Sequence, residues 1–326
     1  MLAGKRSLHL NGSEVERTPL LVPSFSSKGF PEVGQIVKYS AELIEGPALI
    51  SAYDLHYKEI AQPLTFASLL FLDSGGYEAS KDLDLSDLGD KRHRPKGWTR
   101  DDHEAVLATW QSQVPTVLIS YDHPRERLPI AQQIDRARNM APGRTDVLRE
   151  ILLKPETDDQ RYLSIERIQQ HIHSLAGFDI IGVTEKEVGS SLLDRMENLG
   201  RLRIALSKAG LNTPIHVFGS LDTVTTPMYF LAGADIFDGL TWLRFAYQDG
   251  RTVYKQNFGA TVGLSIKAHV LDGICWNHNY RYLQELQLEM RRFLNTADYK
   301  SFRVNGELFR NGVESAIEAI GGSDGR

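Results

Sequence analysis

The chain has 326 residues, of which 41% are hydrophobic and 24% charged, and its formal net charge is −5. These values are typical of a globular protein with a full core, and they exclude a surface that is basic all over. The single cysteine, Cys275, excludes an internal disulfide framework and predicts a reducing compartment, so we expect a cytoplasmic protein. Because no run of about 18 apolar residues occurs and the N-terminus lacks an apolar secretory segment, we expect no contact with a membrane.

Short apolar, β-branched runs alternate along the chain with longer segments of helical period. They predict strands at 20–24, 47–52, 69–73, 116–121, 151–154, 179–183, 214–218 and 235–237. Eight strands that alternate with helices favour parallel pairing. The sequence therefore predicts an α/β fold, a (β/α)₈ TIM barrel, with an open doubly wound sheet as the alternative.

We expect the whole chain, 1–326, to form a single barrel domain with two additions. The long segment 79–113 is predicted to be an insertion after the third strand. The region from about 246 to 326 is predicted to be a C-terminal helical extension, with a helix over 280–295.

Polar residues and glycines stand where the predicted strands end. They are Asp73, Asp122, Lys154, Gly182, Gly219 and Asp238. In (β/α)₈ barrels the carboxyl ends of the strands form one mouth, which holds the active site. A single Asp after a strand is commonly a cap or turn residue, but three at separate strand ends indicate a shared pocket.

The stretch FLDSGGYEAS (71–80) allows two interpretations. Asp73, Ser74, Gly75 and Gly76 are ordinary residues of a tight turn. They would also place a carboxylate beside backbone that a substrate can approach closely. Two carboxylates across a pocket suit substitution at an acetal carbon, so a sugar hydrolase and an enzyme that acts on a nucleoside's glycosidic bond both fit.

Two motifs resemble those of the tRNA-guanine transglycosylases. LDSGGYE is similar to that family's Asp-Ser-Gly-Gly-Phe-Gln signature, and GADIFDGLTWLR resembles its Gly-x-Asp-x-Phe-Asp segment with an arginine six residues on. HVFGS and ISYDHP occupy the places of two weaker motifs, and the resemblance covers roughly residues 45–295. It implies a (β/α)₈ barrel, in agreement with the strand pattern.

The resemblance also implies roles for single residues. Asp238 would be the nucleophile that attacks C1′ of the nucleoside, and Asp73 the general acid and base. Asp122 would bind the base, whose N1–H and 2-amino groups are donors, while backbone N–H groups near Gly182 could serve O6. Further substrate contacts are expected from Ser74, Gly75, Gly76, Lys154, Gly219 and Arg244, the last at phosphate or ribose; a salt bridge at the rim is the alternative for Arg244.

The chain departs from the family pattern at three places. Only Cys275 remains of the cysteines that hold the family's structural zinc; with His269 and His278 it would lack a fourth ligand, so no metal and no cofactor is expected. Lys154 stands where the family has a glutamine, and a cation can only donate hydrogen bonds. Tyr77-Glu78 replaces Phe-Gln.

The implied activity is a pentosyltransferase that exchanges guanine in a polynucleotide for a free 7-deazaguanine base. Divergence from the family favours DNA as the substrate, with tRNA as the alternative. A barrel glycoside hydrolase and a non-catalytic nucleic-acid-binding subunit are the other interpretations, and a homodimer or a partner subunit is compatible with either. An acidic chain needs local basic residues to hold a polyanion. The candidates are Lys91, Arg92, Arg94, Lys96, Arg125 and Arg127.

Overall fold

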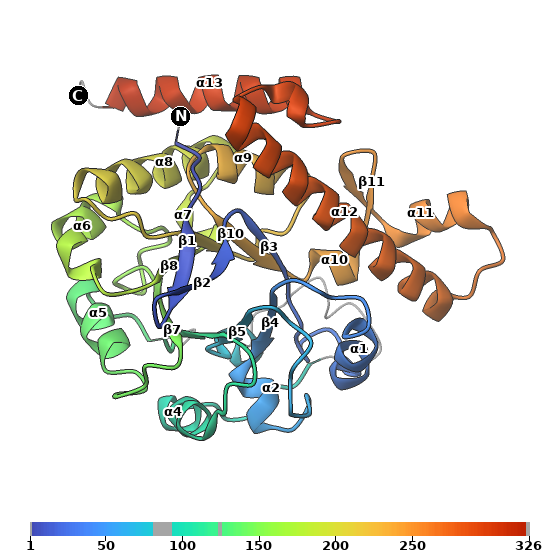
Figure 1. The fold of residues 1–326 in the computed structure, drawn as a ribbon, viewed down its shortest axis with the longest axis horizontal. Coiled ribbons are helices and arrows are strands. Elements are labelled where there is room, and N and C mark those ends of the chain that lie inside the picture. The colour runs from blue at the N-terminus through green and yellow to red at the C-terminus, as the bar shows by residue number, and fades with distance from the viewer. Residues whose placement is uncertain (1, 81–92, 123–125, 324–326) are drawn as a thin grey trace.

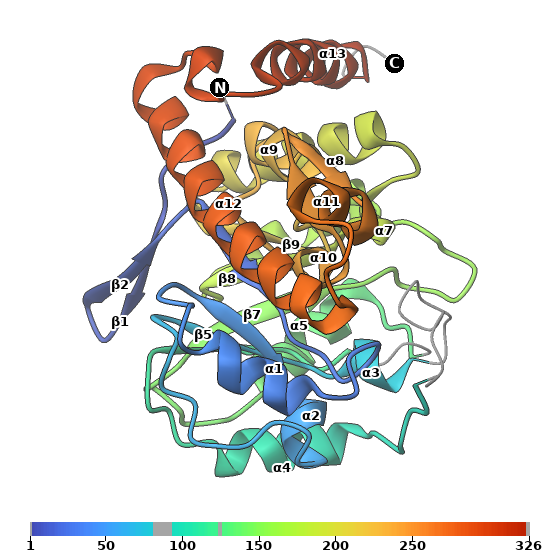
Figure 2. The same ribbon diagram turned by 90° about the vertical axis from the view of Figure 1, so that its right-hand side faces the viewer.

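The computed structural model of the chain describes residues 2–80, 93–122 and 126–323 (Figures 1 and 2). Eight parallel strands form one sheet in the order β3–β10–β9–β8–β7–β6–β5–β4. They are β3 (Leu20–Pro23), β4 (Ala48–Ser51), β5 (Leu70–Asp73), β6 (Thr116–Ile119), β7 (Leu148–Leu153), β8 (Ile180–Thr184), β9 (Ile215–Phe218) and β10 (Ile236–Gly239). A parallel bridge between Ser24 and Leu49 joins the two ends of this order. The predicted (β/α)₈ barrel is confirmed.

The strands form because both of their faces are buried. Successive strand residues point alternately into the barrel and toward the surrounding helices. One apolar cluster fills the barrel interior. It includes Leu20, Val22, Leu49, Phe71, Val117, Ile119, Leu148, Leu152, Ile180 and Ile236. Their strand neighbours, such as Leu21, Ile50 and Leu70, belong to the larger cluster under the helices. This two-sided burial is why the strands appear in the sequence as short, nearly continuous apolar runs.

Helices surround the barrel in the order that the alternating pattern predicts (Figure 1). They are α1 (Val33–Ser40), α2 (Ala52–His56), α3 (Gly76–Ala79), α4 (Arg100–Thr109), α5 (Ile130–Arg138), α6 (Ile165–Gln170), α7 (Glu185–Val188), α8 (Leu192–Lys208), α9 (Thr225–Leu231) and α10 (Thr241–Arg244), with a 3₁₀ turn at Ile172–Leu175. Capping boxes begin α4 at Thr99 and α8 at Ser191. Within the predicted insertion 79–113, α4 is the helix that connects β5 to β6, and residues 81–92 lie outside the described residues.

A hairpin that the sequence analysis did not predict precedes the barrel. It consists of β1 (Ser7–Leu10) and β2 (Ser13–Arg17), joined at Asn11-Gly12, both with positive φ. Leu8 packs into the apolar cluster of the barrel interior, so the hairpin covers the end opposite the mouth. In Figure 2 the hairpin lies at the left edge, while α3 and α7, which follow strand carboxyl ends, lie on the right.

The C-terminal region forms the predicted helical extension, with a short hairpin in addition. It contains β11 (Ala246–Gln248), β12 (Arg251–Val253), α11 (Lys255–Val262), α12 (Ala268–Thr296), a 3₁₀ turn at Tyr299–Ser301 and α13 (Gly306–Ser323). Figure 1 shows α12 running along one side of the barrel, where it contacts α10 and β3, and α13 lying against α8 and α9. None of the helices in the described part of the chain is both long and apolar enough to cross a membrane.

A buried charge cluster ties the N-terminal segment to the barrel. Asp235 precedes β10 and accepts from Arg6 at 2.5 Å and from Arg203 of α8 at 2.6 Å. Its Oδ2 also accepts from the backbone N–H of Ile215, at 2.8 Å. All three charged side chains are buried. Burial lowers the pKa of Arg203 to about 10 although Asp235 opposes that shift. This carboxylate therefore holds two guanidinium groups and a strand end together.

Replacing Asp235 by alanine should leave two buried guanidinium groups without their anion. We expect the free energy of unfolding to fall by about 3–5 kcal/mol. Urea unfolding followed by circular dichroism measures the change. The control is Asp146→Ala, which removes an ion pair with Arg144 whose carboxylate is 54% exposed and should cost less than about 1 kcal/mol. Equal losses in the two variants would contradict a stabilising role for the buried cluster.

Candidate active site

A cavity of about 480 Å³ opens at the carboxyl ends of the strands. We call it the mouth cavity. The predicted site residues that line it are Asp73, Gly76, Asp122, Arg127, Lys154, Gly219, Asp238 and Arg244. The structure thus brings together all three predicted aspartates, which come from three separate strand ends. Other lining residues were not predicted: Ser24, Ser26, Lys28, Glu78, Glu185 and Glu187.

Asp238 lies at the inner wall of the mouth cavity and is held by groups from two other strands, β3 and β9, and the residues that follow them. Its Oδ2 accepts from the hydroxyl of Ser24 at 2.7 Å. Its Oδ1 accepts from the backbone N–H of Gly219 at 3.0 Å and lies 3.3 Å from Nε2 of His216. The carboxylate is 6% exposed. These contacts fix both oxygens while leaving the group at the cavity surface, as a nucleophile requires.

Asp73 ends β5 on the same cavity, in a different environment. Burial raises its pKa well above the ordinary value, and the charges of Asp122, Glu78 and Asp238 raise it further. A carboxyl that keeps its proton near neutral pH can act as a general acid. Two carboxyl groups whose surroundings separate their roles are the usual sign of an acid and a nucleophile.

The two glycines after Asp73 are required for different reasons. Gly75 has a φ of +85°, and a Cβ there would lie 2.8 Å from both Trp98 and Tyr53. At Gly76 a Cβ would lie 2.5 Å from Oδ1 of Asp122. Gly76 therefore lets the Asp73 turn approach Asp122, and Ser74 donates a hydrogen bond to the same Asp122 oxygen.

Asp122 and Lys154 form one charge network rather than two independent binding groups. Nζ of Lys154 lies 3.2 Å from Asp122 and 3.1 Å from Glu187, and Glu187 also pairs with Arg127 at 3.0 Å. Burial opposes ionisation of Asp122, but Lys154 and the Ser74 hydroxyl outweigh it and lower its pKa. Lys154 likewise keeps its charge, because Asp122 and Glu187 overcome its burial and raise its pKa. Lys154 thus serves at least to hold Asp122 ionised.

A further carboxyl group in the mouth cavity, that of Glu78, is buried among hydroxyl groups. Glu78 accepts hydrogen bonds from Ser26 and from Ser51. Burial, followed by the charge of Asp54, raises the pKa of Glu78 to about 7. Nearby, Nζ of Lys28 donates to the backbone carbonyl of Ser80 at 3.1 Å. The Glu78 carboxyl therefore changes its charge near neutral pH on this side of the cavity.

Gly182 lies below the mouth cavity rather than in its lining. A Cβ there would lie 2.6 Å from Oε1 of Glu150 and 2.6 Å from the ring of Phe218. The missing side chain makes room for Glu150 inside the barrel, where Oε1 lies 2.8 Å from Nδ1 of His216. Both Glu150 and His216 are 0% exposed. A buried polar line thus runs from Glu150 through His216 to Asp238.

The residues predicted to contact nucleic acid lie in different places: some are outside the described residues, some are exposed, and one lines the mouth cavity. Lys91, Arg92 and Arg125 lie outside the described residues. Arg94 and Lys96 are exposed, and Lys96 pairs with Glu59 and packs over Tyr57. Arg127 lies inside the mouth cavity on Glu187, as described above. Arg244 also lines the cavity and donates to the hydroxyl of Tyr77 at 2.6 Å.

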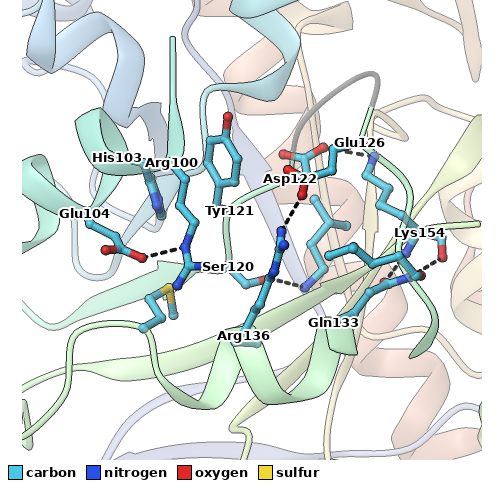
Figure 3. Close-up of a pocket in the computed structure, with 14 residues that line it drawn as sticks. Arg100, His103, Glu104, Ser120, Tyr121, Asp122, Glu126, Gln133, Arg136 and Lys154 are labelled. Atoms are coloured by element: carbon cyan, nitrogen blue, oxygen red, sulfur yellow. Dashed lines mark hydrogen bonds and ion pairs between the residues drawn. The ribbon is translucent and has the colours of Figure 1, made fainter. Parts of the chain in front are cut away.

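Figure 3 shows a second, smaller pocket of about 50 Å³ that shares Asp122 and Lys154 with the mouth cavity. It lies between α4 and α5. Ion pairs of Arg100 with Glu104 and of Arg136 with Glu126 stand at its edge. His103 is buried there, and neither of its ring nitrogens has a hydrogen-bond partner among the described residues. Burial lowers its pKa to about 4, so this ring is neutral.

Cys275 and His278, two of the residues considered above for zinc, make different contacts. Cys275 is buried in a small cluster with Ala246 and Phe258. The ring of His278 contacts the backbone carbonyl of Tyr247 at 2.6 Å. In the part of the chain that the structure describes, no three His, Cys, Asp or Glu side chains gather as a metal site would require.

His216 and Glu150, which lie beneath the mouth cavity, were also not predicted. Each is a polar residue at an inward-facing strand position: His216 has apolar neighbours in IHVF, and Glu150 lies between Arg149 and Ile151 in LREILL. This pattern was a usable signal, because a buried charge must find a partner.

No known protein family matches the chain, and a search of curated proteins finds no significant relative. The geometry defines the class of site: a pocket at the mouth of a (β/α)₈ barrel with one carboxylate held by two hydrogen bonds and a histidine ring, and a second carboxyl of raised pKa.

Replacing Gly76 by alanine should disturb the pocket, because the new methyl group overlaps the Asp122 carboxylate. We expect the free energy of unfolding to fall by about 1–3 kcal/mol, as for other overpacked sites. The matched control is Gly97→Ala, since a Cβ at Gly97 meets nothing within 4 Å. Calorimetric unfolding of both variants measures the difference. A loss in Gly97→Ala as large as that in Gly76→Ala would show that the contact with Asp122 is not its cause.

Proposed function

We propose that this chain exchanges guanine in a polynucleotide for a free 7-deazaguanine base, through a covalent bond between Asp238 and the sugar. The observation that supports it most directly is the pair of unlike carboxyl groups on one cavity: Asp238, which two hydrogen bonds and the ring of His216 hold, and Asp73, whose pKa burial raises. The resemblance of the two motifs that contain these residues supports the same chemistry. We propose DNA as the substrate, and tRNA is the alternative.

In the first half of the reaction, a carboxylate oxygen of Asp238 attacks C1′ and the bond from C1′ to N9 of guanine breaks. The electron pair of that bond goes to the base, which takes the proton of Asp73. In the second half, Asp73 removes the N9 proton of the incoming base. That nitrogen then attacks C1′, and Asp238 leaves as a carboxylate. One glycosidic bond replaces another, so the exchange requires neither ATP nor a redox cofactor.

Binding of the leaving base would use the network around Lys154. An ionised Asp122 accepts hydrogen bonds, and guanine offers N1–H and its 2-amino group as donors. Lys154 holds that charge and also donates to the hydroxyl of Thr184 at 2.8 Å. The exposed Arg94 and Lys96, with the predicted basic residues near them, would contact phosphates and bring a polyanion to an acidic protein.

Replacing Asp238 by alanine should abolish the exchange, because no oxygen remains to bond to C1′. Purified protein is incubated with guanine-containing DNA or with tRNA and a labelled base, and nucleosides are then analysed by mass spectrometry. A covalent protein–nucleic acid complex should be visible on denaturing gels with wild-type protein and absent with Asp238→Ala. The control Asp249→Asn changes an exposed carboxylate outside the cavity and should behave as wild type. Full exchange by Asp238→Ala would refute the assignment, and incorporation into tRNA alone would identify the alternative substrate.

Replacing Asp73 by asparagine should slow the exchange by roughly 10²–10⁴-fold, the usual contribution of a general acid. Nucleic-acid binding should remain nearly intact. Because the wild-type carboxyl must begin each turnover protonated, exchange should fall as the pH rises through its raised pKa. Asp73→Asn should lack that alkaline loss. If binding falls as much as exchange does, Asp73 is a structural turn residue.

A further inference from the structure

The line Glu150–His216–Asp238 crosses the barrel interior directly beneath the proposed nucleophile. Glu150 extends from β7, His216 from β9 and Asp238 from β10. The ring lies between the two carboxylates, 2.8 Å from Glu150 at Nδ1 and 3.3 Å from Asp238 at Nε2. A neutral imidazole can donate through only one nitrogen. If both carboxyl groups are ionised, the other nitrogen of a neutral ring would turn its lone pair toward a carboxylate oxygen, so two ionised carboxylates beside the ring favour its doubly protonated form.

The other described neighbours of the His216 ring are uncharged, so Glu150 and Asp238 are the charged groups that face it. Phe218 stacks on the ring with centroids 3.9 Å apart, and the edge of Phe71 contacts it at 5.4 Å. From β8 it faces Gly182, its register partner, which has no side chain. Burial disfavours the charged ring, but Glu150 and Asp238 outweigh burial and raise the pKa of His216 to about 9. Burial raises the pKa of Glu150, and the positive ring counteracts that shift.

We propose that the Glu150–His216 pair positions Asp238 and stabilises its carboxylate form, which makes Asp238 a good leaving group in the second half of the exchange. The proposal rests on the proposed function. When Asp238 bonds to C1′ it becomes a neutral ester, and His216 loses one of its two negative neighbours. When the incoming base attacks C1′, the electron pair of the Asp238–C1′ bond returns to the aspartate oxygen. A positive ring at 3.3 Å favours that return.

This role predicts a signature that a purely structural defect would not produce. Glu150→Gln keeps the shape of the side chain and an oxygen for Nδ1–H, but it removes the charge that supports the imidazolium. Loss of one such partner should lower the pKa of His216 by about 1–3 pH units. With its pKa near 7, about a tenth of the rings stay protonated at pH 8, so exchange at pH 8 should fall about tenfold and recover toward pH 6.

The covalent complex should respond in the opposite direction from exchange. If the imidazolium favours departure of Asp238, Glu150→Gln should accumulate more covalent protein–DNA complex at pH 8 while exchanging more slowly. A misfolded or mispositioned site would lose both. The matched control is Glu126→Gln, which changes an exposed glutamate that pairs with Arg136. It should alter neither the amount of covalent complex nor the rate of exchange.

Nuclear magnetic resonance of protein labelled with ¹⁵N-histidine tests the proposal without any substrate. We expect one buried imidazole, assigned by its change in Glu150→Gln and in His216→Asn, to stay protonated until about pH 9. The neutral buried ring of His103 is an internal reference, since it should titrate near pH 4. A neutral His216 at pH 7 would overturn the proposal, as would identical pH profiles of exchange for Glu150→Gln and wild type. If the ring is protonated but no polynucleotide exchanges its guanine, the proposed function fails and the role in catalysis fails with it, while the charge assignment of His216 stands.

Discussion

Parallel closure of the sheet is the constraint on which the rest of the structure depends. The bridge between Ser24 and Leu49 joins β3 to β4, so all eight strands end at one mouth. Side chains separated by tens or hundreds of residues, such as Ser24 and Asp238, thereby come within 2.7 Å. The alternation of inward and outward residues then determines which side chains can enter the interior at all. The chemistry of the site follows from that alternation and from closure.

Several carboxyl groups lie together at the mouth, and different partners offset the cost of burying each of them. Lys154 and Ser74 hold Asp122 ionised, and Ser24, Gly219 and His216 surround Asp238. Asp73 has no cation this close among its described contacts, and burial raises its pKa well above the ordinary value. Charges buried in this way are costly unless they are paired, so the differences between the three groups are differences in their partners.

The strand pattern could be predicted because buried parallel strands are short apolar runs, and the aspartates could be predicted because they end those runs. Glu150 was missed because it precedes the predicted strand 151–154, whereas β7 begins at Leu148. The hairpin β1–β2 was missed although Asn11-Gly12 between alternating residues is a hairpin signal. The partners of Lys154 could not be predicted, because Glu187 approaches it from another strand–helix unit and only the folded barrel fixes that approach.

The shared space at Gly182 has a consequence for how this barrel can vary. A methyl group at 182 would occupy the position of the Glu150 carboxylate, with the two atoms 2.6 Å apart. The two positions are therefore not independent during evolution or in a mutant library. A side chain at 182 becomes acceptable only after 150 has shortened, and that first step removes the anion beside His216. Selection for the polar interior should therefore preserve a glycine on β8 that does not line the mouth cavity.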